Sequence, residues 1–189
     1  GSVNVETGGD FSPATEGIDF YESLEGMLVQ INNPVATSPT THFSASEEIW
    51  VLPDDAANAT SRTVRGASLI TATDYNPERI QIDDLNNATT LPDVNVGARL
   101  GTITGVVSYD FNNFEVLVPT APMVMQASGL GKEVTSLTGA PDQLTVATFN
   151  VENLDPSDGA PKFAALAAAI VGNLRAPDIL TLEEVQDND

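Results

Sequence analysis

Amide and carboxylate side chains gather at two places in the last quarter of the chain, each directly after a short apolar run. The first cluster follows residues 144–149 and the second follows residues 179–182. Their members are Asn150, Glu152 and Asn153, and then Glu183, Glu184 and Asp187. Oxygen ligands of this kind suit a hard cation such as Mg²⁺, which takes one or two carboxylates and leaves positions for water or a phosphate oxygen. The clusters could therefore hold such a cation, with positions left for a phosphate oxygen.

The two apolar runs are typical of strands, and the segment between them is typical of a helix. Its apolar residues recur at helical spacing: Phe163, Leu166, Ala167, Ile170 and Leu174. Ser157 or Asp158 is expected to cap this helix, and Pro177 to end it. Strands joined in this way form a parallel, right-handed βαβ unit. Their carboxyl ends, which carry the two polar clusters, are where α/β folds bind ligands.

The alternation of side chains along a strand limits how the second cluster is used. Successive residues of a strand point to opposite faces of the sheet, so only one of Glu183 and Glu184 is expected to reach a site on a given face. Acidic residues also follow buried strands for no functional reason, so the spacing alone leaves an ordinary solvated role open for each of them.

Two stretches of this region, Val146–Leu154 (VATFNVENL) and Asp178–Val185 (DILTLEEV), carry a resemblance to a known family. They resemble the start of the endonuclease/exonuclease/phosphatase superfamily, which has the deoxyribonuclease-I-like fold. The resemblance implies that Asn150 contacts the metal site or the scissile phosphate and that Glu184 holds the metal. It implies Mg²⁺, or Mn²⁺ or Ca²⁺, and metal-assisted hydrolysis of phosphodiesters in DNA or RNA. A lipid-headgroup phosphodiesterase of the same fold is the alternative substrate class.

The chain departs from the family pattern in its histidine. The resemblance implies a catalytic His and further Asp or Asn residues on later strands, whereas the sole histidine, His42, lies far upstream and matches no family position. His42 is expected to be a surface residue. Residues 144–189 are therefore interpreted as the truncated start of a catalytic domain, inactive until the remainder is supplied.

The preceding region is expected to be mainly β, with five strands and no clear helix over residues 20–120. The strands are expected at residues 24–31, 48–52, 79–83, 98–109 and 114–118. The third is expected to be short and exposed. An OB-like Greek-key barrel over residues 19–120 accommodates this number of strands, and a β-sandwich is the second choice. Residues 1–18 are expected to be a loose lead-in and residues 121–143 a linker.

Residues 17–31, 48–52 and 105–118 resemble the OB-like domain that precedes this catalytic domain in large secreted bacterial nucleases, which implies an extracellular location. The net charge of −20, from 27 acidic and 7 basic residues, argues against a basic clamp for nucleic acid on either part. There is no cysteine, which excludes disulfides and thiolate chemistry, and no apolar run of membrane-spanning length. A nucleic-acid-binding or structural β module without catalysis is the second hypothesis.

Overall fold

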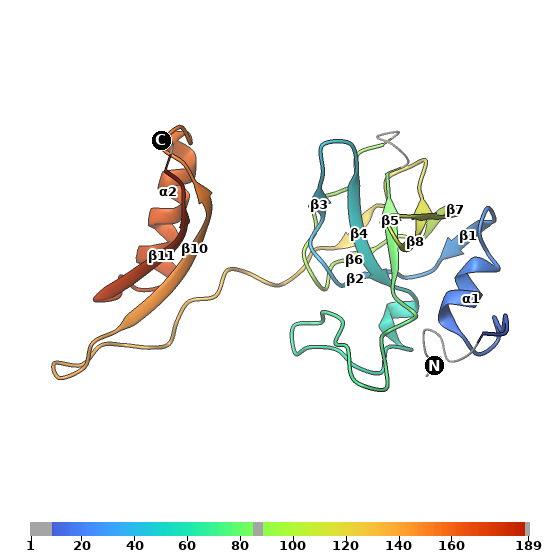
Figure 1. The fold of residues 1–189 in the computed structure, drawn as a ribbon, viewed down its shortest axis with the longest axis horizontal. Helices are drawn as coiled ribbons and strands as arrows, with labels where there is room; N and C mark the ends of the chain where they lie inside the picture. Colours follow the sequence, from blue (N-terminus) through green and yellow to red (C-terminus); the bar gives the residue numbers. More distant parts are fainter. Residues whose placement is uncertain (1–8, 85–88, 188–189) are drawn as a thin grey trace. The chain divides into compact units, whose positions relative to one another are not determined.

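The protein divides into two compact units, residues 1–130 and residues 131–189, and each is described by itself (Figure 1). The computed structural model describes residues 9–84 and 89–187, so residues 1–8 of the expected lead-in lie outside it. The division falls within residues 121–143, the expected linker. Within the described residues, no helix combines the length and apolar character needed to cross a membrane.

The first unit is mainly β, a curled mixed sheet that forms half of a barrel (Figure 1). Its elements in the described residues are α1 Gly17–Glu22, β1 Leu28–Ile31, β2 Val35–Ala36, β3 Thr41–His42, β4 Glu47–Leu52, η1 Asp54–Ala56, β5 Ile80–Asp83, β6 Arg99–Leu100, β7 Ile103–Asp110, β8 Asn113–Leu117 and β9 Val124–Gln126. The strand order is β1-β7-β8-β5-β4-β2-β6-β9, with β3 added to β4. The pair β5–β8 is parallel, and the other pairs in this sheet are antiparallel.

The inner face of the half-barrel carries the hydrophobic core. Alternate residues of the central strands are buried there, as the period of two along a strand requires: Ile49, Val51, Ile80, Ile82, Val107 and Val116. Tyr21 and Leu24 pack against this core from α1 and the turn after it. Burial of each large aliphatic side chain contributes about 1.5–3 kcal/mol, so these strands hold the unit together.

Several expected strand boundaries are wrong. The chain before Leu28 forms α1 and a turn rather than a strand, because Tyr21 and Leu24, three residues apart, both reach the core. The expected strand 98–109 is split into β6 and β7, because Leu100 pairs with β9 whereas Ile103 pairs with β1. The expected linker contains β9, which pairs with β6.

The expected exposure of the third strand is also wrong. All four residues of β5 are buried, because this strand lies between β4 and β8 in the middle of the sheet. Its polar residues Gln81 and Asp83 are only 3% and 8% exposed, although they alternate with the core residues Ile80 and Ile82. An alternating pattern does not distinguish a solvated outer face from one that is covered.

The second unit consists of two parallel strands with a helix between them in the chain: β10 Val146–Leu154, α2 Ala160–Ala168 with the π-helical turn η2 Ala169–Asn173, and β11 Ile179–Val185. The helix lies along the strand pair (Figure 1). The residue before α2 is Gly159, rather than Ser157 or Asp158 as expected. Asp158 instead accepts a hydrogen bond from the Asp155 N–H and pairs with Lys162.

One face of this strand pair is uncovered within the second unit. Along β10, Ala147, Phe149 and Val151 are the more buried residues, and Val151 is 1% exposed. On the opposite face, Val146 and its register partner Ile179 are 65% and 47% exposed. This face therefore begins with exposed apolar residues, of the kind that sheets bury against further elements, and ends in the polar cluster.

Candidate functional site

The parallel register of β10 and β11 brings the two polar clusters together. Thr148 pairs with Thr181, Phe149 with Leu182, and Asn150 with Glu183, after which the register is interrupted up to Leu154. Both strands run in the same direction, so their carboxyl ends carry the clusters side by side. The two polar clusters of the sequence thus lie next to each other in the structure.

Asn150 is held from both ends of its side-chain amide. Its Nδ2 donates a hydrogen bond to Oε1 of Glu184 over 2.6 Å, and its Oδ1 accepts one from the Glu152 N–H over 2.8 Å. The second bond fixes which way the amide points, and the first joins the two residues that the family resemblance selects. Among the described residues, the side-chain hydrogen bond that Glu184 accepts from Asn150 uses its Oε1.

Both glutamates reach the same face of β10, contrary to the expectation that only one does. Thr148 and Asn150 are two residues apart and share a face. The Thr148 hydroxyl donates to Glu183, and Asn150 donates to Glu184. Glu184 departs from strand geometry with φ of 59°, and this interrupts the alternation. The left-handed conformation is costly for a residue other than glycine, and Glu152 and Asn153 on β10 adopt it as well.

Further contacts brace the ends of the two strands. Gln186 Nε2 donates to Asn153 Oδ1 over 2.8 Å, and Lys162 Nζ donates to the Glu152 carbonyl over 2.9 Å. Sequence reasoning did not assign roles to Thr148, Lys162 or Gln186. The position of Thr148, two residues before Asn150 on an alternating strand, is the one sequence signal for any of them.

The donor set fits a hard divalent ion only in part. Glu183 and Glu184 supply two carboxylates on one face, the number that Mg²⁺ takes while it keeps several waters or phosphate oxygens. Across residues 9–84 and 89–187, no three acidic or histidine side chains converge as a ready-made cage. An ion at this place would therefore need water, substrate or further protein ligands beside these two carboxylates.

His42 lies in the half-barrel and is part of a local ion-pair cluster. Its Nδ1 is 2.9 Å from Glu47 Oε1, and its Nε2 is 2.7 Å from Asp93 Oδ1. The hydrogen bond to Asp93, followed by that to Glu47, raises the pKa of His42. Its side chain is 53% exposed, as expected for a surface residue.

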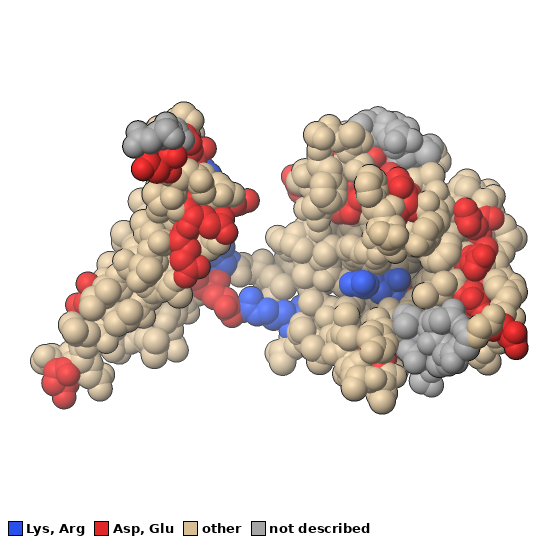
Figure 2. Space-filling view, in the orientation of Figure 1, with Lys and Arg blue, Asp and Glu red and all other residues tan. Residues whose placement is uncertain are grey.

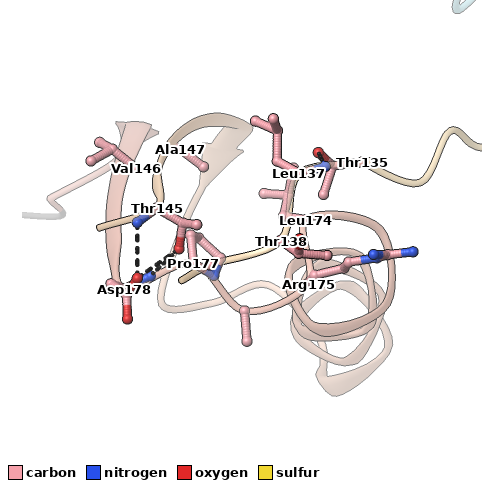
Figure 3. A pocket seen from close by; sticks show the side chains of 12 residues that line it. Thr135, Leu137, Thr138, Thr145, Val146, Ala147, Leu174, Arg175, Pro177 and Asp178 are labelled. Carbon is pink, nitrogen blue, oxygen red and sulfur yellow. Dashed lines mark hydrogen bonds between the residues drawn. The ribbon is translucent and has the colours of Figure 1, made fainter. Parts of the chain in front are cut away.

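A cavity of about 380 Å³ in the second unit lies at the opposite, amino ends of the strands (Figure 3). Thr145 and Asp178 face each other in it: the Thr145 N–H and hydroxyl donate to Asp178 Oδ2 over 2.9 and 2.8 Å. These bonds lower the pKa of Asp178, and they tie the starts of β10 and β11 together. Because ligands of α/β folds bind at the carboxyl ends, we assign this cavity a structural role.

The half-barrel has acidic and aromatic side chains but no basic groove in its described residues. Figure 2 shows acidic side chains spread over the visible face of both units, with Lys and Arg confined to small areas. Arg79 stacks on Trp50 at 4.1 Å, Arg99 pairs with Asp55, and Arg62 bonds to the Gly66 carbonyl.

Aromatic side chains of the half-barrel contact one another. Phe114 lies against Tyr21 and Tyr109. Phe114 thus packs against both rings, while Tyr109 remains 50% exposed.

A second cavity, of about 490 Å³, opens on the outer face of the half-barrel and has an acidic lining. Glu48 of β4, Gln81 of β5 and Glu115 of β8 line it. Burial, followed by the charges of Asp83, Asp110 and Glu48, raises the pKa of Glu115 to about 7. Burial and the charge of Asp83 also raise the pKa of Glu48.

A family model described as a domain of unknown function, DUF8508, matches residues 1–128. The chain belongs to the DUF8508 family. No curated protein and no solved structure matches it. The DUF8508 match covers the half-barrel and ends before β10, so the acidic cavity lies within the matched region, whereas Asn150 and Glu184 lie outside it.

Glu115→Gln is expected to flatten the pH dependence of the stability of the DUF8508 half-barrel. The folded carboxyl titrates at about 7, above its ordinary value of 4.5, so the folded state binds more protons than the unfolded state between these values. The wild-type free energy of unfolding therefore falls as pH rises through this window. Glutamine carries no charge, so the variant is expected to be the more stable protein at pH 8.

Urea unfolding followed by the fluorescence of Trp50, the single tryptophan, measures this effect at pH 5 and pH 8. Glu25→Gln, which removes an exposed carboxylate from the same unit, is the matched control and should leave the pH slope unchanged. Equal slopes for the wild type and Glu115→Gln would contradict the burial of this charge.

Proposed function

We propose that the chain is the N-terminal part of a secreted, divalent-metal-dependent nuclease of the endonuclease/exonuclease/phosphatase type, which hydrolyses phosphodiesters in DNA or RNA. The observation that carries the proposal is the 2.6 Å hydrogen bond between Asn150 Nδ2 and Glu184 Oε1 at the carboxyl ends of two parallel strands. The two residues come from motifs 34 positions apart, and the fold brings their side chains into contact.

The uncovered face of the second unit, which is apolar at the start of β10 and β11, supports a larger catalytic domain. Val146 and Ile179 are more than two-fifths exposed, and sheets bury such apolar residues against further elements. We infer that further strands and helices of the same polypeptide bury this face and supply the remaining catalytic groups. Residues 1–189 alone are therefore expected to be inactive.

The contacts of each residue support the role that we propose for it. Glu184 would hold the divalent ion, with Glu183 beside it as a second carboxylate on the same face. When bound, the ion would stabilise the negative charge that develops on the phosphate. Asn150 would fix the Glu184 carboxylate, and the Glu152 N–H would in turn fix the Asn150 amide.

We infer an OB-like module, extended by extra short strands, for the half-barrel. The curled mixed sheet and the β7–β8 hairpin support this, while β1 and β9 stand at the two ends of the strand order. Arg62, Arg79 and Arg99 make contacts within the unit. A supporting role for the catalytic domain therefore fits this module better than binding of a phosphate backbone, which requires available basic side chains.

The proposal is tested by comparing residues 1–189 with a polypeptide that continues past Asp189 to the end of the catalytic domain. With Mg²⁺ or Mn²⁺, the longer polypeptide is expected to cleave plasmid DNA or RNA, and chelation of the metal should abolish the cleavage. The shorter one is expected to leave both intact. Robust, contaminant-free cleavage by residues 1–189, or no metal-dependent hydrolysis by the longer polypeptide, would overturn the proposal.

A further inference from the structure

The acidic cavity of the half-barrel is built from strands that place their polar residues on one face. Glu48 pairs with Asp83 across β4 and β5, and Gln81, two residues before Asp83, pairs with Glu115 of β8. Side chains at paired positions, and at positions two apart, project from the same face of a sheet. Glu48, Gln81 and Glu115 therefore converge on the cavity of about 490 Å³ that all three line.

Gln81 marks this cavity as more than a solvated acidic surface. The residue is 3% exposed, and its Oε1 is buried without a hydrogen-bond partner among the described residues. A buried acceptor without a hydrogen bond is unfavourable, so a donor supplied by a ligand would remove this penalty. Glu115 is 7% exposed, so it too gives up much of its hydration.

The lining contains acceptors and negative charge but no basic residue. Glu48, Asp110 and Glu115 bring three carboxyl groups, and Lys, Arg and His are absent from the residues that line the cavity. Phe43 and Phe111, 55% and 85% exposed, flank it. Aromatic faces attract cations and also cover aliphatic stems. The complementary ligand thus carries positive charge, hydrogen-bond donors and an apolar chain.

A bare metal ion does not meet this description. No three carboxylates of the described residues converge on a single point, and the cavity is far larger than one ion. An ammonium group has three N–H donors and can donate hydrogen bonds to acceptors that lie apart from one another.

We propose that this cavity binds an alkylammonium group, carried either by a free polyamine or by the lysine side chain of a polypeptide. The ammonium donates to Glu48, Glu115 and Oε1 of Gln81, while its aliphatic chain runs between Phe43 and Phe111.

Isothermal titration of residues 1–189 at pH 8, where Glu115 is ionised, tests the proposal with three probes. Spermidine represents the free polyamine, Nα-acetyl-lysine amide represents the lysine side chain, and Ca²⁺ represents a metal ion. Saturable one-to-one binding of spermidine alone identifies a polyamine site. Binding of the lysine derivative as well identifies a site for a single ammonium group. Failure of both organic probes to bind, or Ca²⁺ binding in their place, overturns the proposal.

Matched variants separate a site from general attraction to an acidic protein. Glu48→Gln and Glu115→Gln keep the shape of the lining and remove one charge each, so each is expected to weaken binding by about tenfold. Glu25→Gln removes one exposed charge elsewhere on the same unit and should leave the affinity unchanged. Equal weakening by all three variants would show diffuse counterion binding and contradict the proposal.

Discussion

Glu184→Gln, in a polypeptide with the complete catalytic domain, is expected to reduce metal-dependent cleavage by about 10²–10³-fold. Glutamine keeps an oxygen at the Oε1 position to accept the hydrogen bond from Asn150, which spans 2.6 Å in the wild type. The substitution removes the charge that would hold the divalent ion. The loss of activity would therefore report on the metal rather than on the local fold.

Glu183→Gln is the matched control, because it removes the same charge from the neighbouring position. Its carboxylate accepts a hydrogen bond from Thr148, and it is assigned a secondary place beside the ion. We expect this variant to keep activity within about tenfold of the wild type. The test compares the kcat of the two variants with that of the wild type at saturating Mg²⁺. A larger loss for Glu183→Gln than for Glu184→Gln would exchange the two assignments, and full activity of both variants would refute them.

Gly105→Ala is expected to destabilise the half-barrel by about 3 kcal/mol or more, the upper end of the range for overpacked cores. A Cβ atom at this position would lie 2.3 Å from the Leu117 carbonyl oxygen and 2.6 Å from Val116 Cγ1. The Leu117 oxygen belongs to the backbone, so the steric clash can be removed only if β7 and β8 move apart. Both strands are hydrogen-bonded in the middle of the sheet, where such a shift disturbs the core.

Gly101→Ala is the control for this effect. The nearest heavy atoms to its Cβ would lie at 3.7 Å, an ordinary van der Waals distance, so its cost is expected to stay below about 1 kcal/mol. Urea unfolding followed by Trp50 fluorescence compares the two variants. Similar midpoints for Gly105→Ala and Gly101→Ala would contradict the close approach of β7 and β8.

Sequence patterns predicted the parts of the fold that rest on long, regular periodicity. The apolar face of α2 and the two apolar runs around it led to a parallel pair, and this pairing places Asn150 beside Glu183 at the end of β11. The short strands β2, β3 and β9 have two or three residues each, too few to show a period of two. Their pairing depends on partners far away in the chain, which local patterns do not encode.

The remaining differences also have physical causes. The alternation rule failed at Glu184 because this residue adopts φ of 59°, a conformation that sequence does not reveal for a glutamate. The polar residues of β5 suggested exposure, yet neighbouring elements cover Gln81 and Asp83. The acidic cavity was not predicted from the sequence, because Glu48, Gln81 and Glu115 come together only through the pairing of three strands.

The central claim is that Asn150 and Glu184 belong to a divalent-metal site, and paramagnetic broadening by Mn²⁺ tests it most directly. The side-chain amide signals of Asn150 in the complete catalytic domain are expected to broaden at substoichiometric Mn²⁺. Those of Asn173, whose amide donates to the Glu133 carbonyl in the same unit, should stay sharp. Glu184→Gln should abolish the broadening. Equal broadening of Asn150 and Asn173, or broadening that survives Glu184→Gln, would contradict the account.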